Sequence, residues 1–301
     1  MSFITKFSNL FAKTESANML GVAFRKDAIA YCFYAPGQKF KTNQLPVEQE
    51  NYLGALKSVL AQKSITANVQ LVLSSSQYQM VQVDKPNIPD DEINAALKWQ
   101  VKDLVTVEPE DMIVDYFSGP IQAGGAEKIN VVCARKSSLA PLVEQFEKSG
   151  LSLKSITTEE FAFAGLLPHK EQAVLLVCQQ PNEEIVILIV KASQIYFHRR
   201  LRGYTQIANK TPEELSFGII DSLSLEIQRS MDYFERQLKQ PPIKDIQLLL
   251  PIKAEQYLAS KLAENTLATV NVLSLDETQI ENRAYAVAYG AATLINGGEQ
   301  Q

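Results

Sequence analysis

The chain is 301 residues long, and at about 150 residues per domain this length predicts two domains or one large domain split by a cleft. Lys and Arg total 29 against 34 Asp and Glu, and the resulting net charge of -5 argues against a nucleic-acid-binding protein. The hydrophobic fraction of 46% and the charged fraction of 21% are typical of a folded chain rather than a disordered one. No apolar run reaches the roughly 18 residues that a membrane-spanning helix needs.

The three cysteines, Cys32, Cys133 and Cys178, each lie inside an apolar run. Their odd number and wide spacing argue against a disulfide framework or a Cys-x-x-Cys metal site. We therefore expect buried cysteines that act as small hydrophobic side chains. Because the N-terminus lacks the apolar core and cleavage site of an export signal, the sequence predicts a cytoplasmic protein.

Residues 1–16 form a separate N-terminal segment, of which the first 13 have the pattern of a short amphipathic helix. Its apolar residues share one stripe: Phe3, Ile4, Phe7, Leu10 and Phe11. Such a stripe with basic flanks suits a membrane interface or a partner surface. The alternative is that the segment packs on the protein's own body or frays, since so short a helix is marginal alone.

The pattern then becomes that of strands and helices in alternation. Residues 20–24 and 28–34 flank a polar turn and predict a β-hairpin. Further along we expect a helix that carries apolar residues from Tyr52 to Leu60 on one face, and then strands at 69–73 and 78–83.

A compact α/β subdomain is expected at about residues 84–150. It comprises a helix at 91–104 capped by Asp90, strands at 113–117 and 129–134, and a helix that ends before Gly150.

The second half begins near residue 173, and its predicted strands are 174–178, 185–190, 194–200, 246–250 and 270–273. Thr211 followed by Pro212 and Glu214 predicts a helix start, and we expect that helix to run to Lys239. A helix is also expected at 254–264. The last helix, 282–294, is rich in Ala and Gly, so we expect it to pack closely against the first sheet.

Two stretches carry a resemblance to one protein family. The sequence DEINAALKWQVKDLV at 91–105, followed by EPEDMIVDYF at 108–117, is similar to the inserted subdomain of PilM-type pilus assembly proteins. The sequence EIQRSMDYFERQ at 226–237 resembles the interdomain helix of the same family. The order of elements agrees over roughly residues 18–295, and within the family the chain looks most like the MSHA-type members.

The resemblance implies an α/β, actin-like fold of the FtsA and PilM kind, with two lobes and a subdomain inserted in the first. The implied parts are a first lobe at 17–170, a second lobe at 171–280, a C-terminal helix at 281–295 that packs back on the first lobe, and a loose tail at 296–301. The implied function is that of a cytoplasmic scaffold of type IV pilus biogenesis, peripheral at the inner membrane. It would bind the N-terminal tail of a PilN-like inner-membrane protein (MshJ in the MSHA system) in a groove between the core sheet and the inserted subdomain.

Actin-like proteins hold phosphate with two hairpin turns that carry Asp, Gly and Ser or Thr. In this chain Ala23 stands where the first Asp is expected and Arg25 where a glycine is expected. Cys178 and Gln180 occupy the corresponding places of the second turn, and Leu250-Pro251 replaces the glycine pair near the adenosine. Each charge-assisted hydrogen bond that these residues cannot make is worth roughly 1.5 to 3 kcal/mol, and together they would turn a micromolar site into a millimolar one.

We therefore expect a degenerate, nucleotide-free scaffold with no cofactor, no metal and no enzymatic activity. One alternative is an ATP-binding switch in the same machinery, and another is a GspL-like cytoplasmic component of type II secretion. GspL-like proteins normally continue into a transmembrane helix, which this sequence does not show.

Other polar residues are expected to be structural. Neither a Gly-x-x-x-x-Gly-Lys-Ser/Thr loop nor a Gly-x-Gly-x-x-Gly turn occurs. His169 reads as a loop residue and His198 as the end of a strand, although a triad assembled in space stays open. Three further features are expected to be solvated: the Arg25-Lys26 turn, the basic run 199–202, and the acidic pairs at 159–160, 183–184 and 213–214. For the Arg25-Lys26 turn the alternative is attraction of an anion, and for the basic run it is contact with a membrane or an acidic partner.

Overall fold

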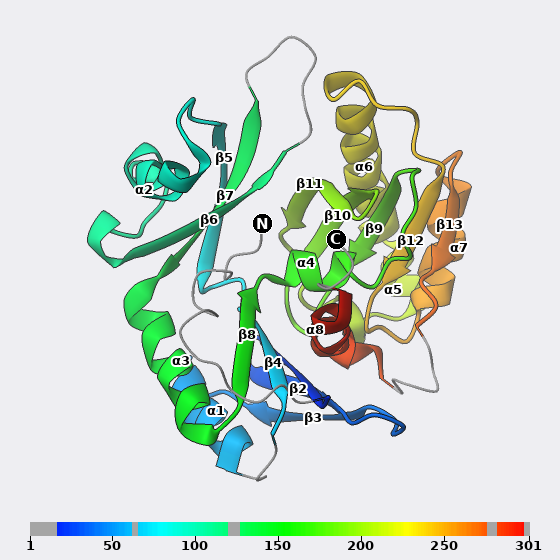
Figure 1. Cartoon of the computed structure of the whole chain (residues 1–301). Helices are drawn as coiled ribbons and strands as arrows, with labels where there is room; N and C mark the ends of the chain where they lie inside the picture. The colour runs from blue at the N-terminus through cyan, green and yellow to red at the C-terminus, as the bar shows by residue number, and fades with distance from the viewer. Residues whose placement is uncertain (1–16, 62–65, 120–126, 276–281, 298–301) are drawn as a thin grey trace. The chain divides into compact units, whose positions relative to one another are not determined.

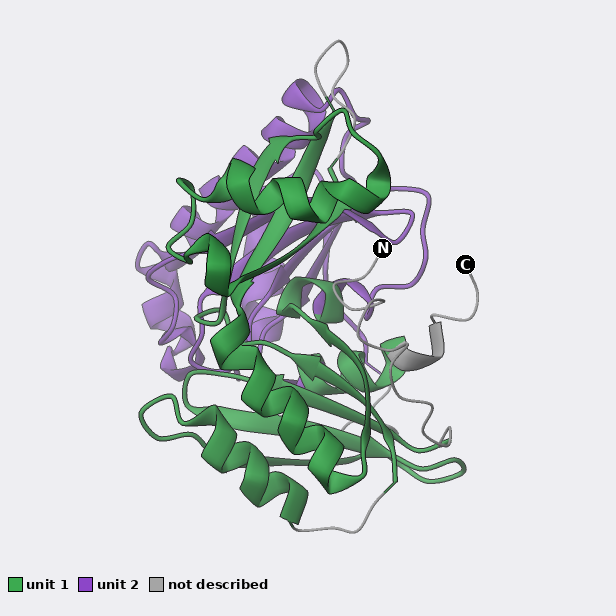
Figure 2. Cartoon of the chain, turned by 60° about the vertical axis from the view of Figure 1, so that its left-hand side comes forward, with its two compact units in different colours: residues 1–119, 126–162, 287–301 green, residues 120–125, 163–286 purple. Residues whose placement is uncertain are grey.

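The computed structural model describes residues 17–61, 66–119, 127–275 and 282–297 (Figure 1). The predicted amphipathic stripe (Phe3, Ile4, Phe7, Leu10 and Phe11) lies outside these residues, as does most of the predicted tail. The chain divides into two compact units (Figure 2). Unit 1 comprises residues 1–119, 126–162 and 287–301, and unit 2 comprises residues 120–125 and 163–286.

The core of unit 1 is a five-stranded sheet in the order β3-β2-β1-β4-β8. Its strands are β1 (Met19–Phe24), β2 (Ala28–Tyr34), β3 (Lys41–Pro46), β4 (Asn68–Val72) and β8 (Ser152–Thr157). β1 and β2 form the predicted hairpin, whereas β4 runs parallel to β1 and to β8. Helices α1 (Tyr52–Ala61) and α3 (Lys136–Ser149) bury their apolar stripes in the same hydrophobic cluster as this sheet.

The inserted part of unit 1 is an antiparallel three-stranded sheet with one helix. The sheet has the order β5 (Tyr78–Asp84), β7 (Lys128–Arg135), β6 (Met112–Ser118), and a 3-10 turn, η2 (Pro109–Asp111), precedes β6. Helix α2 (Asp90–Val101) buries three residues at helical spacing in a cluster with β6 and β7: Ile93, Leu97 and Val101. The prediction that Asp90 caps this helix is wrong, because Pro89 holds the cap position and Asp90 is the first helical residue.

The C-terminal helix α8 (Ala286–Gly297) lies against the sheet of unit 1 from Val287 onward. A Cβ atom placed on Gly21 of β1 would overlap the backbone oxygen of Ala288 and would lie 2.6 Å from the backbone nitrogen of Ala292. Only glycine at this strand position permits so close an approach of helix and strand backbones. The helix is also held by the ring of Tyr289, whose centroid is 4.8 Å from that of Phe40.

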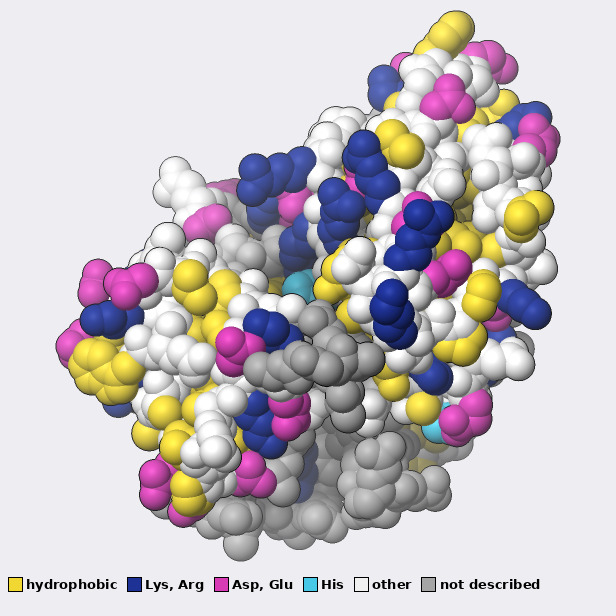
Figure 3. All heavy atoms as spheres, turned by 90° about the horizontal axis from the view of Figure 1, so that it is seen from above, with side chains coloured by type: hydrophobic (Ala, Val, Ile, Leu, Met, Phe, Trp, Pro, Cys, Tyr) yellow, Lys and Arg dark blue, Asp and Glu magenta, His cyan; other side chains and the backbone are white. Residues whose placement is uncertain are grey.

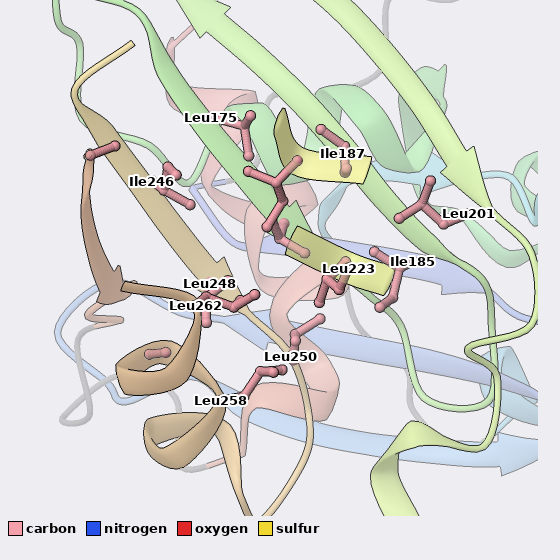
Figure 4. Packing of buried hydrophobic residues seen from close by; sticks show 14 of the residues in the cluster. Leu175, Ile185, Ile187, Leu201, Leu223, Ile246, Leu248, Leu250, Leu258 and Leu262 are labelled. Carbon is pink, nitrogen blue, oxygen red and sulfur yellow. The ribbon is translucent and has the colours of Figure 1, made fainter. Parts of the chain in front are cut away.

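Unit 2 repeats the sheet of unit 1, with the strand order β11-β10-β9-β12-β13. The strands are β9 (Val174–Cys178), β10 (Ile185–Lys191), β11 (Gln194–Leu201), β12 (Asp245–Leu249) and β13 (Thr269–Val272). The hydrophobic cluster around these strands includes Leu258 and Leu262 of α7 (Glu255–Glu264). Figure 4 shows Leu262 beside Leu248 and Leu258 near Leu250.

The long helix predicted from Thr211 to Lys239 is a chain of shorter pieces. The predicted start is confirmed, because Thr211 and Glu214 form a capping box at the head of α5 (Pro212–Ser216). Gly218 then adopts φ 91°, a left-handed conformation that ends one helix before α6 (Ile219–Asp232) begins. The last turn is a π-helix, η4 (Tyr233–Gln237), in which the Leu238 amide bonds to the Tyr233 carbonyl. Sequence periodicity alone does not detect either interruption.

The connections hold three short elements. Helix α4 (Glu159–Ala164) follows β8, η3 (Ile207–Asn209) follows β11, and η5 (Arg283–Tyr285) precedes α8. Among the described residues, no helix is long and apolar enough to cross a membrane.

Candidate functional site

A pocket of about 630 Å³ opens in unit 1 where the core meets the inserted subdomain. Its walls come from the start of α1 (residues 50–53), the β4–β5 connection (75–79), residues 106–107, and the segment from Cys133 to Leu142 that leads into α3. Core helices and the inserted sheet therefore line the same cavity.

The α1 wall is fixed by the backbone just before the helix. Gln49 and Glu50 adopt φ values of 49° and 57°, an uncommon conformation for residues other than glycine. Asn51 then caps the helix, since its Oδ1 accepts a hydrogen bond of 3.0 Å from the Gly54 amide. This cap places Tyr52 in the first turn, where its ring stacks on Phe24 at 5.0 Å between centroids.

The opposite wall is held by polar contacts. The Gln79 Oε1 accepts hydrogen bonds from the Thr106 amide at 2.6 Å and the Thr106 hydroxyl at 3.1 Å, and Arg135 donates to the Thr106 carbonyl at 3.0 Å. At the start of α3, Asp111 accepts hydrogen bonds from the amide and the hydroxyl of Ser137 at 2.7 and 2.6 Å. These bonds hold the pKa of Asp111 below its usual value. The Asp111–Ser137 bonds therefore tie the segment before β6 to the start of α3, and the Thr106 bonds hold the connection after α2 to β5 and β7.

The pocket mixes polar and apolar groups. Its charged lining residues are Glu50 and Arg135, and Leu53, Val107 and Leu142 supply apolar surface. Tyr78 also lines the pocket, and its hydroxyl donates a 2.7 Å hydrogen bond to the Glu160 carboxylate.

The acidic pair 159–160 was predicted to be solvated, and this prediction is wrong. Glu159 and Glu160 are 1% and 2% exposed, because α4 starts directly after the buried strand β8. Glu183 is likewise buried, in the β9–β10 turn, whereas Glu213 is exposed as expected.

The first predicted phosphate turn is packed with the chain's own side chains. Ala23 is buried in β1, and Arg25 is 2% exposed rather than solvated. The Arg25 guanidinium turns back into unit 1, where it donates to Gln44 Oε1 at 2.7 Å and pairs with Asp27 at 3.3 Å. A buried arginine side chain thus stands at the position where a glycine is expected, and of residues 23–27 only Lys26 and Asp27 are exposed.

The second turn is closed by hydrogen bonds within unit 2. Cys178 is buried, with its thiol donating to the Val186 carbonyl at 3.4 Å, and Gln180 is 3% exposed. The Gln179 side-chain amide donates to the carbonyls of Glu183 at 2.8 Å and Tyr204 at 3.0 Å. Backbone amides are the groups that could donate to a phosphate, and those of Gln179 and Glu183 donate instead to the carbonyls of Leu249 and Gln180, each at 3.1 Å.

The third position, next to Leu250-Pro251, is occupied by an ion pair between buried Glu255 and half-buried Arg283. Glu255 Oε1 accepts the Leu250 amide at 2.6 Å, and Arg283 pairs with Glu255 Oε2 at 2.8 Å. Arg283 also donates to the carbonyls of Leu248 at 3.1 Å and Leu273 at 2.9 Å. Burial raises the pKa of Glu255 despite the neighbouring Arg283. The pair covers the carboxyl ends of β12 and β13, the side where open α/β sheets bind ligands.

The three cysteines are buried, as expected, and none of them forms a disulfide. Burial raises the pKa of Cys32 to about 12 and that of Cys133 to about 11, so both stay protonated thiols. In the described part of the chain, no three His, Cys, Asp or Glu residues come together as a metal site would require.

The two histidines differ in their surroundings. His169 lies in a loop, as predicted, and contacts Ser193 Oγ at 2.9 Å and Glu171 at 3.3 Å, an exposed Ser-His-Glu cluster outside both pockets. His198 is not at a strand end, because it pairs with Leu188 in the interior of β11.

The basic run at 199–202 lies on β11 and the turn after it. Arg199 pairs with Glu226 of α6 at 2.9 Å, and Arg229 pairs with the same carboxylate at 2.7 Å. On the face of the molecule that Figure 3 shows, acidic side chains also lie among the Lys and Arg side chains.

A second pocket, of about 410 Å³, lies in unit 2 between α6 and the α7–β13 connection. Its charged lining residues are all acidic: Asp232, Glu235 and Glu264. Two of them already have cationic neighbours, since Asp232 lies 3.8 Å from Arg236 and Glu264 lies 2.8 Å from Lys261.

Comparison with known proteins identifies the fold. The PilM-PilN type IV pilus biogenesis complex is similar with a TM-score of 0.67 and 16% identity, over 93% of this chain and 99% of that one. The cytoplasmic domain of EpsL, an inner-membrane component of the type II secretion system of Vibrio cholerae, has a TM-score of 0.50 and 15% identity, over 87% and 99%. A Bacteroides thetaiotaomicron protein with an actin-like ATPase fold has a TM-score of 0.51 and 13% identity, over 95% and 99%.

By sequence, no protein-family model and no curated protein matches the chain. The structural similarities nevertheless establish that the chain has the actin-like α/β fold, which confirms the fold implied by the resemblance.

Proposed function

We propose that this protein is a PilM-like scaffold of type IV pilus biogenesis that binds the N-terminal tail of a PilN-like inner-membrane protein. The pocket of unit 1 carries the proposal, because it lies between the core and the inserted subdomain, where the resemblance places the partner groove. Its mixed polar and apolar walls suit an extended peptide, which offers backbone hydrogen bonds and side chains in alternation.

The proposed assignment to one member of the PilM-type family, the MSHA-type protein MshI, rests on the sequence stretches at 91–117 and 226–237. The partner is then MshJ-like, and the protein acts in the cytoplasm, peripherally at the inner membrane. The apolar stripe of the N-terminal segment supports this placement as a membrane or partner contact.

The scaffold is proposed to work without nucleotide and without enzymatic activity. Buried side chains fill both predicted phosphate turns, and an ion pair fills the position near the adenosine. An ATP-binding switch would need these groups to be displaced. Isothermal titration with ATP and Mg²⁺ is expected to give no saturable heat, and micromolar binding would favour the switch instead.

A second candidate is a GspL-like component of type II secretion, which the similarity to the EpsL cytoplasmic domain favours. The partner distinguishes the two candidates. Binding of the PilN-like tail supports the pilus scaffold, and exclusive binding of a type II secretion partner supports the alternative.

The peptide groove is tested by titration calorimetry with a synthetic peptide of the PilN-like tail. Ser138 is exposed, lies at the start of α3 and lines the pocket, so Ser138→Trp is expected to fill the groove and abolish binding. Ala140 is exposed on the same helix but outside the pocket lining, so Ala140→Trp is the matched control and should bind normally. Equal binding by both variants would remove the pocket from the proposal.

A further inference from the structure

The pocket of unit 2 has no part in the proposed function, and it runs along a helix. Its lining follows α6 and η4 from Ser224 to Glu235, a distance of about 16 Å at 1.5 Å per residue. The α7–β13 connection forms the other side, and Asn265 Nδ2 donates to Ser224 Oγ at 3.0 Å across one end. The pocket is therefore about three helical turns long.

Apolar side chains line this pocket and are exposed at its edge. The apolar lining comprises Ile227, Met231, Ile246, Leu262 and Val270. Leu267 also lines the pocket, and its side chain is fully exposed. Leu225 of α6 is 47% exposed and lies three positions before the lining residue Gln228, which places the two side by side on the helix. Exposed apolar side chains that gather at a hollow are typical of an interaction surface.

The charge at the pocket selects the kind of partner. Among the described residues, the charged side chains of the lining are all acidic, namely Asp232, Glu235 and Glu264. The cationic neighbours of Asp232 and Glu264 are surface side chains, and such pairs contribute little to stability. Glu235 has no cationic partner within the described ranges, and its Oε1 accepts a hydrogen bond of 3.4 Å from the Ile243 amide. The pocket therefore suits an apolar segment that carries positive charge.

The N-terminal segment of this chain has these properties. Residues 1–13 include Lys6 and Lys13 and no Asp or Glu. In the helix that their pattern predicts, the stripe from Phe3 to Phe11 is about 12 Å long, which the pocket can accommodate. Phe3, Phe7 and Phe11 are spaced four residues apart, as anchor residues are when an amphipathic helix binds in a groove.

We propose that the N-terminal segment of one copy of this protein docks as an amphipathic helix in the unit 2 pocket of a second copy. The phenylalanine side chains contact the apolar lining, and a lysine of the segment pairs with Glu235. Because the segment and the pocket are different surfaces, the contact is heterologous, and it links successive copies into a ring or an open chain. A second copy is thus the partner surface for the apolar stripe. This inference is independent of the partner groove in unit 1.

The test is sedimentation velocity of the full chain over a series of concentrations. The wild type is expected to associate reversibly. Glu235→Lys and the double variant Lys6→Glu/Lys13→Glu are each expected to associate about tenfold more weakly, since each replaces a charge-assisted contact by repulsion. A chain with all three substitutions is expected to recover association, because the charges are then exchanged between segment and pocket.

Asp221→Lys provides the matched control. Asp221 is an exposed acid on the same helix and does not line the pocket, so this variant should associate as the wild type does. A wild-type chain that stays monomeric at every concentration overturns the inference. Association that Glu235→Lys leaves unchanged, or that Asp221→Lys weakens equally, also overturns it.

The membrane is the competing partner of the segment, and flotation with phosphatidylglycerol vesicles tests it. A monomeric chain that floats with these vesicles, and no longer floats after Lys6→Glu/Lys13→Glu, would assign the segment to the lipid surface and contradict docking on a second copy. None of these results changes the expected binding of the PilN-like tail in unit 1, so the two proposals fail separately.

Discussion

Units 1 and 2 each contain a five-stranded sheet in which three antiparallel strands are followed by two parallel ones. They differ in what joins the last two strands. In unit 2, β12 and β13 are connected through α7 alone, whereas in unit 1 the whole inserted sheet, α2 and α3 lie between β4 and β8. The insertion supplies one wall of the pocket of unit 1.

The two units also use their buried polar groups differently. At the carboxyl ends of the unit 2 strands, Glu255 and Arg283 satisfy one another and the surrounding backbone. At the pocket of unit 1, the Tyr52 hydroxyl has no such partner among the described residues. The same strand order thus carries strand ends covered by an ion pair in unit 2, and in unit 1 a pocket lined by a tyrosine whose buried hydroxyl has no partner among the described residues.

The largest expected effect comes from removing the Glu255–Arg283 ion pair at the strand ends of unit 2. Arg283→Ala would leave the Glu255 carboxylate buried without its cation, which typically costs about 4 kcal/mol of unfolding free energy. Urea unfolding followed by circular dichroism measures the change. Arg236→Ala removes an exposed cation 3.8 Å from Asp232 and should cost under about 0.5 kcal/mol. Similar destabilisation of both variants would mean that the buried pair does not stabilise unit 2.

The next effect concerns the helix that closes unit 1. Gly21→Ala places a methyl group on the backbone of α8, and the overpacking is expected to cost about 3 kcal/mol. Hydrogen exchange of residues 287–294 should become faster in this variant. Gly37→Ala meets no atom within 4 Å but has φ +75°, so it should destabilise without affecting α8. Unchanged exchange in Gly21→Ala would show that the close approach is not needed.

The smallest effect is a pH dependence that originates in unit 2. Burial raises the pKa of Glu255 above the usual 4.5, and Arg283 does not fully offset it. A carboxyl with a raised pKa in the folded state adds stability below its unfolded pKa and loses it as pH rises through the folded pKa. As pH rises from 4.5, the free energy of unfolding of Glu255→Gln should therefore increase relative to that of the wild type.

The exposed Glu144 provides the control of opposite sign for this pH dependence. Lys148 lowers the pKa of Glu144, so its stabilising contribution is present above the unfolded pKa and is lost as pH falls through the folded pKa. The free energy of unfolding of Glu144→Gln should therefore not increase relative to that of the wild type as pH rises. A pH-independent difference between Glu255→Gln and the wild type would contradict the raised pKa of Glu255.

Sequence patterns predict the local elements well because they depend on nearby residues. Two apolar runs on either side of a polar turn predict the β1–β2 hairpin, and Thr211 with Glu214 predicts the capping box. The actin-like fold, in contrast, came from the resemblance rather than from any single motif.

Burial of the polar residues could not be predicted, since it depends on pairs far apart in the chain. Tyr78 meets Glu160 across 82 positions, and Arg283 meets Glu255 across 28. Arg25 looked like a solvated turn residue because nothing near it in sequence indicates Gln44 as its partner. Tyr52 was expected only as part of an apolar helix face, and its unpaired hydroxyl has no sequence signal.

Hydrogen–deuterium exchange of the full chain, with and without the PilN-like tail peptide, tests the partner groove most directly. Bound peptide should slow exchange in the pocket walls of unit 1, at residues 50–53 and 75–79 and at the start of α3. Saturable binding with protection confined to unit 2, or no protection at any peptide concentration, would contradict a groove in unit 1.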